Sequence, residues 1–173
     1  FLSKQVVSGE YYFLNLRPAA GAPGAVVCGG VERCDPQYRV VRSRFRYHSI
    51  EFVLSGAGEL VTSGRRYPLG AGSLFYYGPA TRHEIATDPQ RPMTKYFVDF
   101  CGPRFTRLLE GHPLAGHAPC RAGGEIRLAD VFGSLQRYGR GAGAHGQSLC
   151  DCLLELLILE VAEHALPQDE AES

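Results

Sequence analysis

The chain contains no tryptophan and a single methionine among its 173 residues, and neither sign of charge is in excess. Lysine plus arginine and aspartate plus glutamate each count 18, so the formal net charge is zero. A dedicated nucleic-acid surface normally shows a basic excess, and this balance argues against one. No apolar run approaches the roughly 18 residues that indicate a membrane-spanning helix, and the first residues show no signal-peptide pattern. We therefore expect a protein without a membrane span.

The cysteines also lack the spacing of a zinc module or of a C-x-x-C redox motif. Cys150 and Cys152 fall in a helical pattern, about 200° apart around the axis, so an intact helix cannot direct both at one ion. Reduced thiols of this kind are typical of a cytoplasmic protein, in which most are buried as small hydrophobic side chains. The six cysteines are Cys28, Cys34, Cys101, Cys120, Cys150 and Cys152.

Residues 1–101 are predicted to form short strands separated by turns rich in glycine and proline, a pattern typical of a sandwich or barrel. Alternation in the last strand places Lys95, Phe97, Asp99 and Cys101 on one face. The predicted strands are Tyr11–Leu16, Ala25–Glu32, Tyr38–Arg46, Ile50–Leu54, Glu59–Thr62, Arg66–Leu69, Ser73–Tyr77, His83–Ala86 and Met93–Cys101.

The period changes after residue 102. Pro103 suits the first turn of a helix over Arg104–Glu110, and apolar residues repeat at helical spacing between Leu128 and Tyr138. The strongest helix prediction runs from Gln147 to Ala165, with Pro167 beyond its end. Residues 111–124 and 139–146 are predicted to be loops. We therefore divide the chain into a barrel over 1–102 with an N-terminal arm over 1–10, a helical segment over 103–166, and a polar tail or linker over 167–173.

The last predicted helix is apolar on two sides, although packing on one sheet needs a single apolar stripe. One stripe can cover the chain's own core, and the other requires a partner. Complete burial within one chain is the alternative. We favour a homodimer formed through Leu149, Leu153, Leu156 and Leu157.

Signals for catalysis are weak. The chain has no G-x-S-x-G nucleophile elbow. Its glycine-rich stretch GRGAGAHG lacks the lysine and the preceding strand of a phosphate-binding loop. We expect a binding module with no catalytic residues and no cofactor, and not an enzyme.

Several segments carry a family resemblance: DPQYRVVRSRF, IEFVLSGAGEL, GRRYPLGAGSLFYYGPATRHEI and MTKYFVDFCGPRF. Their order and spacing resemble the sensor domain of the AraC family of bacterial transcription regulators. The resemblance implies a mainly β fold, a cupin-like double-stranded β-helix (jelly-roll) barrel followed by two to three α-helices. It also implies a small-molecule effector in the barrel that reorders the N-terminal arm, and a homodimer through the C-terminal helix. DNA is expected to be bound only by helix-turn-helix motifs of a domain outside this chain.

The same comparison bears on metal binding. Metal-binding cupins resemble the pattern H-x-H-x(3,4)-E-x(6)-G followed by a later histidine. Counting back from Gly56, the glutamate position falls on Ser49 and the two histidine positions fall near residues 42–45, so that only His83 remains. A zinc- or iron-like ion generally takes three or four converging N, O or S donors, and His48 and Glu51 point to opposite faces of an extended strand. We expect no metal.

Small barrels hold one small ligand among mostly apolar side chains and a few polar groups. The resemblance implies ligand contacts at Arg42, Arg44, Glu51, His83, Lys95 and Phe97, with a sugar as one candidate effector. A carboxylate in the apolar stretch IEFVLS is costly unless it is exposed or paired, and Arg44 or Lys95 can supply the partner. Ordinary alternation also permits Glu51 to face solvent, and His83 to be a fully hydrogen-bonded barrel residue.

Two rival interpretations remain. One is a metal-dependent cupin enzyme, either a dioxygenase or a sugar epimerase. The other is a dimerisation scaffold whose barrel is filled by its own side chains and takes no ligand.

Overall fold

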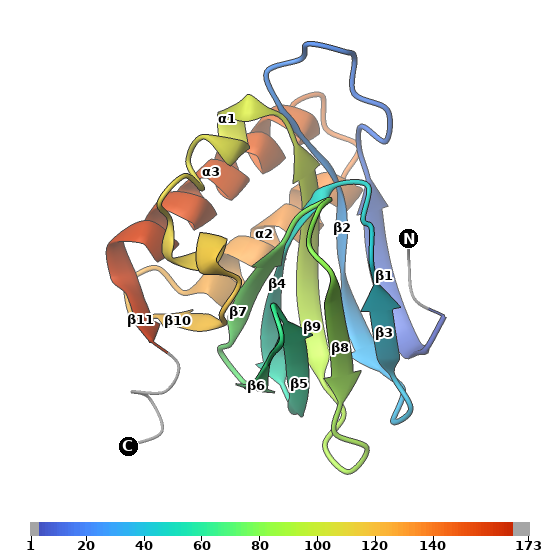
Figure 1. The fold of residues 1–173 in the computed structure, drawn as a ribbon. Coiled ribbons are helices and arrows are strands. Elements are labelled where there is room, and N and C mark those ends of the chain that lie inside the picture. The colour runs from blue at the N-terminus through green and yellow to red at the C-terminus, as the bar shows by residue number, and fades with distance from the viewer. Residues whose placement is uncertain (1–3, 168–173) are drawn as a thin grey trace.

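The computed structural model describes residues 4–167. Within that span, two antiparallel sheets face each other, and helices cover the outer face of the larger sheet (Figure 1). The larger sheet has the order β1-β2-β9-β4-β7-β10-β11, and the smaller sheet has the order β3-β8-β5-β6. The main strands are β1 Val6–Phe13, β2 Ala25–Cys34, β3 Arg39–Arg42, β4 His48–Ser55, β5 Ala57–Thr62, β6 Arg65–Gly70, β7 Leu74–Tyr77, β8 His83–Thr87 and β9 Thr94–Cys101. This architecture confirms the predicted mainly β barrel followed by helices.

The barrel strands alternate between two apolar clusters because successive side chains point to opposite faces of a sheet. Val53, Phe75 and Ile85 belong to the cluster between the two sheets. Val98 and Phe100 belong to the cluster between the larger sheet and the helices. The sequence pattern predicts this division of β9 correctly.

The first strand differs from its prediction. It runs over Val6–Phe13 and pairs with β2 along its whole length, with a shift between Val6 and Ser8. Residues 6–10 of the predicted arm therefore belong to the sheet, and residues 1–3 lie outside the described residues. β-branched Val6 and Val7 favour an extended chain. The predicted strand Tyr38–Arg46 is too long, because the observed strand β3 spans only Arg39–Arg42.

The C-terminal part is helical with two short strands added to the larger sheet. Its helices are α1 Pro103–Thr106, a 3-10 turn at Pro113–Gly116, α2 Leu128–Arg140 and α3 Gly146–His164. Strand β10, Cys120–Ala122, lies in the predicted loop 111–124 and pairs with both β7 and β11, Ala165–Pro167. The α1 prediction is too long, because the helix ends at Thr106.

Helix α3 is fastened to the barrel by a buried carboxylate. Asp151 Oδ1 accepts a hydrogen bond of 2.8 Å from the Val26 backbone nitrogen. Gln147 Nε2 donates to Val26 O and to Asp151 Oδ1, each at 3.0 Å. Val26 stands where the β2–β9 register shifts, so the side chains of α3 satisfy backbone groups that the ladder leaves free. Within residues 4–167, no helix combines the length and apolar character that crossing a membrane demands.

Candidate ligand-binding site inside the barrel

A buried ion triad occupies the space between the two sheets. Lys95 Nζ on β9 lies 3.1 Å from Glu32 Oε2 on β2 and 3.1 Å from Glu51 Oε2 on β4, and the lysine side chain is 1% exposed. The register places Glu32 opposite Lys95 and Glu51 opposite Phe97, so neighbouring strands bring the three charges together. Burial alone would lower the pKa of Lys95, but the nearby carboxylates, Glu51 foremost, raise it well above its usual value. The lysine therefore stays charged.

Glu51 also joins a chain of polar and aromatic groups. The Tyr77 hydroxyl donates to Glu51 Oε1 at 2.8 Å, and Arg42 Nη1 donates to the Tyr77 hydroxyl at 3.4 Å. The Tyr77 ring stacks on the His83 ring with centroids 3.8 Å apart. Burial foremost, together with the Glu51 charge, raises the pKa of Tyr77 well above its usual value. This tyrosine therefore remains a hydrogen-bond donor.

Aromatic rings surround the lysine ammonium. The Lys95 Nζ atom lies 5.2 Å from the centre of the Tyr38 ring and 5.9 Å from that of Phe97. Tyr11 on β1 donates to Glu32 Oε1 at 3.0 Å, which links the triad to the edge strand of the larger sheet. Such rings favour a cation over their faces, and they also offer flat apolar surfaces to a ligand.

A third buried carboxyl lies on the same inner face. Asp99 is 2% exposed, and its Oδ2 accepts from the Cys28 thiol at 3.4 Å. Ser49 stands opposite Asp99 in the β4–β9 ladder but does not complete a hydrogen bond of ordinary geometry. Burial raises the pKa of Asp99 to about 7, and the Ser49 and Cys28 dipoles oppose this only in part.

The structure thus brings together most of the predicted ligand residues. Glu51, His83, Lys95 and Phe97 are buried in the interior, and Arg42 reaches it through Tyr77. Arg44 does not join them, because it lies exposed between β3 and β4, beyond the end of the shortened strand. Lys95, and not Arg44, is the partner of Glu51.

Sequence reasoning missed several members of the cluster. Most of them follow once the alternation of side chains along each strand is counted from a residue that faces the interior. Asp99 shares the face of Lys95 and Phe97, and Glu32 follows by pairing opposite Lys95. Tyr77 follows from alternation along β7. The missed residues are Tyr11, Cys28, Glu32, Tyr38, Tyr77 and Asp99.

The interior does not fit the metal centre of metal-binding cupins. Within the described residues, no group of three or more His, Cys, Asp and Glu side chains is placed to hold an ion. The carboxylates of Glu32 and Glu51 are held by Lys95, and the His83 ring is stacked on Tyr77.

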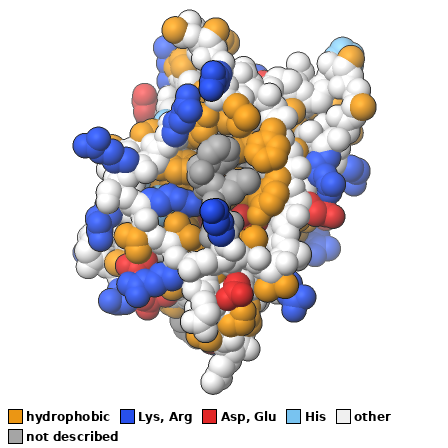
Figure 2. All heavy atoms as spheres, turned by 90° about the vertical axis from the view of Figure 1, so that its right-hand side faces the viewer, with side chains coloured by type: hydrophobic (Ala, Val, Ile, Leu, Met, Phe, Trp, Pro, Cys, Tyr) orange, Lys and Arg blue, Asp and Glu red, His pale blue; other side chains and the backbone are white. Residues whose placement is uncertain are grey.

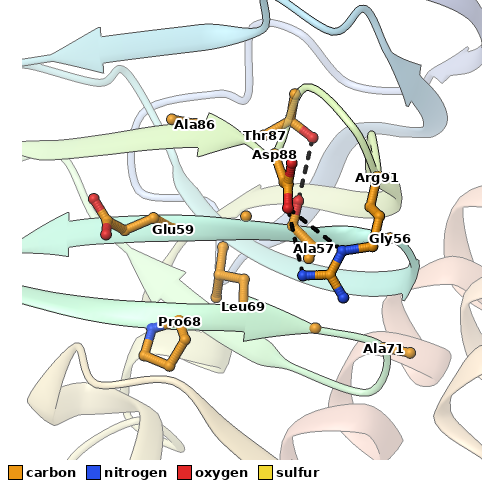
Figure 3. Close-up of a pocket in the computed structure, with 12 residues that line it drawn as sticks. Gly56, Ala57, Glu59, Pro68, Leu69, Ala71, Ala86, Thr87, Asp88 and Arg91 are labelled. Carbon is orange, nitrogen blue, oxygen red and sulfur yellow. Dashed lines mark hydrogen bonds and ion pairs between the residues drawn. The ribbon is translucent and has the colours of Figure 1, made fainter.

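A surface hollow lies apart from this cluster, along β5, β6 and β8 (Figure 3). Its volume is about 620 Å³, and glycine, alanine and backbone form much of its lining. Of its charged groups, Asp88 and Arg91 pair with one another at 3.4 Å, and Glu59 pairs with Arg66 at 2.6 Å. None of the predicted ligand residues lines it. With few free polar groups it offers little to define a ligand, so we place the candidate site in the barrel interior.

Helix α3 shows both predicted apolar stripes. Leu154, Leu157, Ile158 and Val161 are buried in the chain's own core. The opposite stripe stays open, with Leu149, Leu156 and Leu159 exposed and Leu153 partly buried. The prediction of Leu157 as a dimer contact is wrong, because its side chain is buried in the chain's own core.

Two facing sheets around an enclosed polar cluster, with helices behind, define a cupin-type ligand-binding barrel. The chain matches the family described as "AraC-like ligand binding domain" over residues 27–172. It belongs to that family, as the sequence resemblance predicts. No curated protein matches the chain.

The chain is also similar to several solved structures, one of which is named as a cupin barrel protein. A Cupin 2 conserved barrel domain protein from Salinispora arenicola is 22% identical with a TM-score of 0.42, and the match covers 60% of this chain and 83% of that one. The plu4264 protein from Photorhabdus luminescens is 15% identical with a TM-score of 0.44 over 63% and 86%. A predicted oxalate decarboxylase from Thermotoga maritima is 16% identical with a TM-score of 0.40 over 43% and 66%.

Proposed function

We propose that this chain is the ligand-sensing and dimerisation domain of an AraC-type transcription regulator, and that it binds a small polar effector, such as a sugar, inside the barrel. The observation that supports this most is the enclosed triad of Lys95, Glu32 and Glu51. Three charged groups in an apolar interior are costly to bury, and a polar ligand gives such groups a use. The domain carries out no catalysis in this proposal.

The interior network suggests how occupancy is signalled. Glu32 accepts a hydrogen bond from Tyr11 of β1. A ligand that draws Glu32 or Lys95 away therefore alters this contact between the interior and the edge strand β1. That strand is also held by α2, because Arg140 pairs with Glu10 at 2.9 Å and Gln136 Nε2 donates to Glu10 O at 2.8 Å. A ligand shifts this arrangement only as far as it binds one form better than the other.

We propose that the effector enters between β1 and β3. β1 and β3 are edge strands of different sheets, bridged where the Arg39 backbone nitrogen donates to Gln5 Oε1 at 2.8 Å. In the view of this side in Figure 2, hydrophobic side chains lie above and to the right of the centre, and lysine and arginine side chains lie among and around them.

Ligand binding is tested by thermal-shift screening against sugars. A ligand at 100 times its Kd adds about 2.7 kcal/mol to the free energy of unfolding. Glu51→Gln should abolish the shift produced by any barrel ligand. Glu59→Gln is the matched control, because Glu59 forms an exposed pair with Arg66. If the shift persists in Glu51→Gln, the ligand does not bind in the interior.

We further propose that the open stripe of α3 joins two copies and that a separate helix-turn-helix domain binds DNA. Leu156→Glu should convert dimer to monomer in analytical ultracentrifugation, because a charge in an apolar interface is costly unless paired. Leu54→Glu is the control, since Leu54 is similarly exposed at the end of β4. A wild-type monomer at all concentrations would contradict the dimer.

The rival function is a metal-dependent cupin enzyme. Elemental analysis of extensively dialysed protein separates the two. Stoichiometric iron, nickel or zinc whose binding is lost in His83→Ala would favour the enzyme.

A further inference from the structure

The charges inside the barrel leave one carboxyl without a counter-ion. Lys95 is shared by Glu32 and Glu51. Arg42 contacts the Tyr77 hydroxyl next to Glu51. Within residues 4–167, the structure shows no ion pair at Asp99. This carboxyl is therefore the place in the interior where a new positive charge would be best compensated.

The geometry of Asp99 points in the same direction. Its Oδ2 has the Cys28 thiol as a donor, whereas its Oδ1 is buried and has no hydrogen-bond partner among the described residues. A buried acceptor without a donor costs about 1–3 kcal/mol, and more when it is charged. A ligand N–H group directed at Oδ1 would remove that cost.

His83 offers a second unused acceptor. The Thr81 carbonyl, 3.2 Å from His83 Nδ1, can only accept, so Nδ1 carries the hydrogen. In the neutral ring, Nε2 then holds a lone pair, and it is buried with no hydrogen-bond partner in the described part of the chain. Burial lowers the pKa of His83, which keeps the ring neutral near pH 7.

Among the interior atoms without a hydrogen-bond partner in the described residues, Glu51 Oε2, His83 Nε2 and Asp99 Oδ1 can only accept, and the Ser49 hydroxyl can donate or accept. The cationic donors already have partners. A carboxylate ligand would face the like charges of Glu32, Glu51 and Asp99. We infer that the effector carries a protonated amine that pairs with Asp99 Oδ1, and a further N–H or O–H that donates to His83 Nε2. This inference rests on the proposed function, because it assumes that the effector enters the barrel.

Two matched series of probes test the chemistry. Sorbitol, glucamine and gluconate share one polyhydroxylated chain and differ in one terminal group: alcohol, ammonium or carboxylate. Tyrosol, tyramine and 4-hydroxyphenylacetate offer the same three groups on an aromatic body, suited to the Tyr38 and Phe97 rings. In at least one series, calorimetry should show the amine binding about tenfold or more tighter than the alcohol, since hydrogen bonds to charged groups contribute roughly 1.5–3 kcal/mol. The carboxylate should bind least.

The Asp99→Asn variant should remove the preference for the amine over the alcohol. Exposed Asp130→Asn is the matched control and should retain it. Circular dichroism will establish that both variants fold. Should Asp99→Asn fail to fold, proton release by the wild type provides an independent measurement. An ammonium that pairs with Asp99 favours the charged form of this carboxyl, so binding near pH 7 should release protons. Calorimetry repeated in buffers of different ionisation enthalpy measures that release.

The same linkage predicts the pH dependence. Because the Asp99 carboxyl has a pKa of about 7, it is mostly protonated at pH 6, and amine affinity should rise about tenfold from pH 6 to pH 8 and then level off. The groups that affect Asp99 are Tyr12 of β1, Cys28 of β2, Arg42 of β3, Glu51 of β4 and Tyr77 of β7, with Ser49 opposite. Burial raises the pKa of Tyr12 and that of Cys28, so both stay protonated over this range.

The outcomes separate the two proposals. If an alcohol or a carboxylate binds best and Glu51→Gln weakens it, the barrel is a sensor and the amine inference is wrong. If no amine of either series binds, or if Asp99→Asn keeps the amine preference, the inference is also wrong. Only an amine preference that depends on Asp99 supports it.

Discussion

Replacing Lys95 with methionine should destabilise the fold severely at neutral pH. Methionine retains most of the apolar length of the side chain and removes the ammonium that two carboxylates share. Glu32 and Glu51, whose side chains are 4% and 3% exposed, would then be left as like charges in the interior. Because neither carboxylate can reach bulk water, the cost is set by desolvation more than by lost packing.

The expected loss is about 3–5 kcal/mol, the usual range when one partner of a buried ion pair is removed. A single domain has roughly 5–15 kcal/mol of stability in total, so the variant should lose a large part of it. Guanidinium unfolding followed by far-UV circular dichroism measures the difference. Tryptophan fluorescence cannot, because the chain contains none.

The sign of the pH dependence adds a second check. In the wild type, the pKa of Lys95 is raised, so the stability it contributes is fully present below the unfolded-state value of about 10.4 and is lost only in strong alkali. In Lys95→Met, acid should restore part of the loss, because protonation removes the buried negative charges. The matched control is Arg66→Met, which breaks the exposed pair with Glu59 and should cost about 1 kcal/mol or less. A loss below about 1 kcal/mol in Lys95→Met, against the 3–5 kcal/mol expected of a buried pair, would refute the argument that the triad is desolvated.

Three further outcomes follow from the described contacts. Asp99→Asn should stabilise the ligand-free protein above pH 7 by at most roughly 4 kcal/mol. A carboxyl whose pKa is raised from 3.8 to about 7 weakens the fold progressively as the pH rises between those values. If this is wrong, urea unfolding at pH 5 and at pH 8 will show the same difference in stability between variant and wild type. Asp151→Ala should cost about 1–3 kcal/mol by leaving the Val26 backbone nitrogen unsatisfied, and retention of the wild-type melting temperature would contradict the tether. Gly102→Ala should destabilise because φ is +98° and the added Cβ would clash with Gly24 Cα. Thermal denaturation measures the loss, and unchanged stability would argue against this close approach.

The barrel strands were accessible from sequence because alternation and turn residues are local signals. Each predicted barrel strand has a counterpart, and the inward face of β9 was predicted correctly. β10 was not, since Cys120–Ala122 is extended only because β7 and β11 pair with it. The register shift beside Val26 was equally hidden, because a bulge is stabilised partly by a side chain 125 residues away.

The site shows the same division between local and long-range information. Alternation identifies which side chains of one strand face inward, so Lys95 and Phe97 could be proposed. It does not show which strands are neighbours, and the pairing of β2 with β9 makes Glu32 a partner of Lys95. The prediction that Arg44 faces the interior fails because the strand expected to contain it ends at Arg42.

The triad itself supports a binding role more than a structural one. Replacing a buried ion network with well-packed hydrophobic side chains of similar volume is often neutral or stabilising, and glutamine keeps an oxygen that can accept from Tyr11 or Tyr77. The combined change Glu32→Gln, Glu51→Gln and Lys95→Met should therefore fold with stability close to that of the wild type, whereas Lys95→Met alone does not. If the charges serve a ligand, this neutral barrel should bind none of the compounds that shift the wild-type melting temperature. A neutral barrel that is strongly destabilised would instead assign the charges to folding, and one that keeps full ligand affinity would remove the triad from the site.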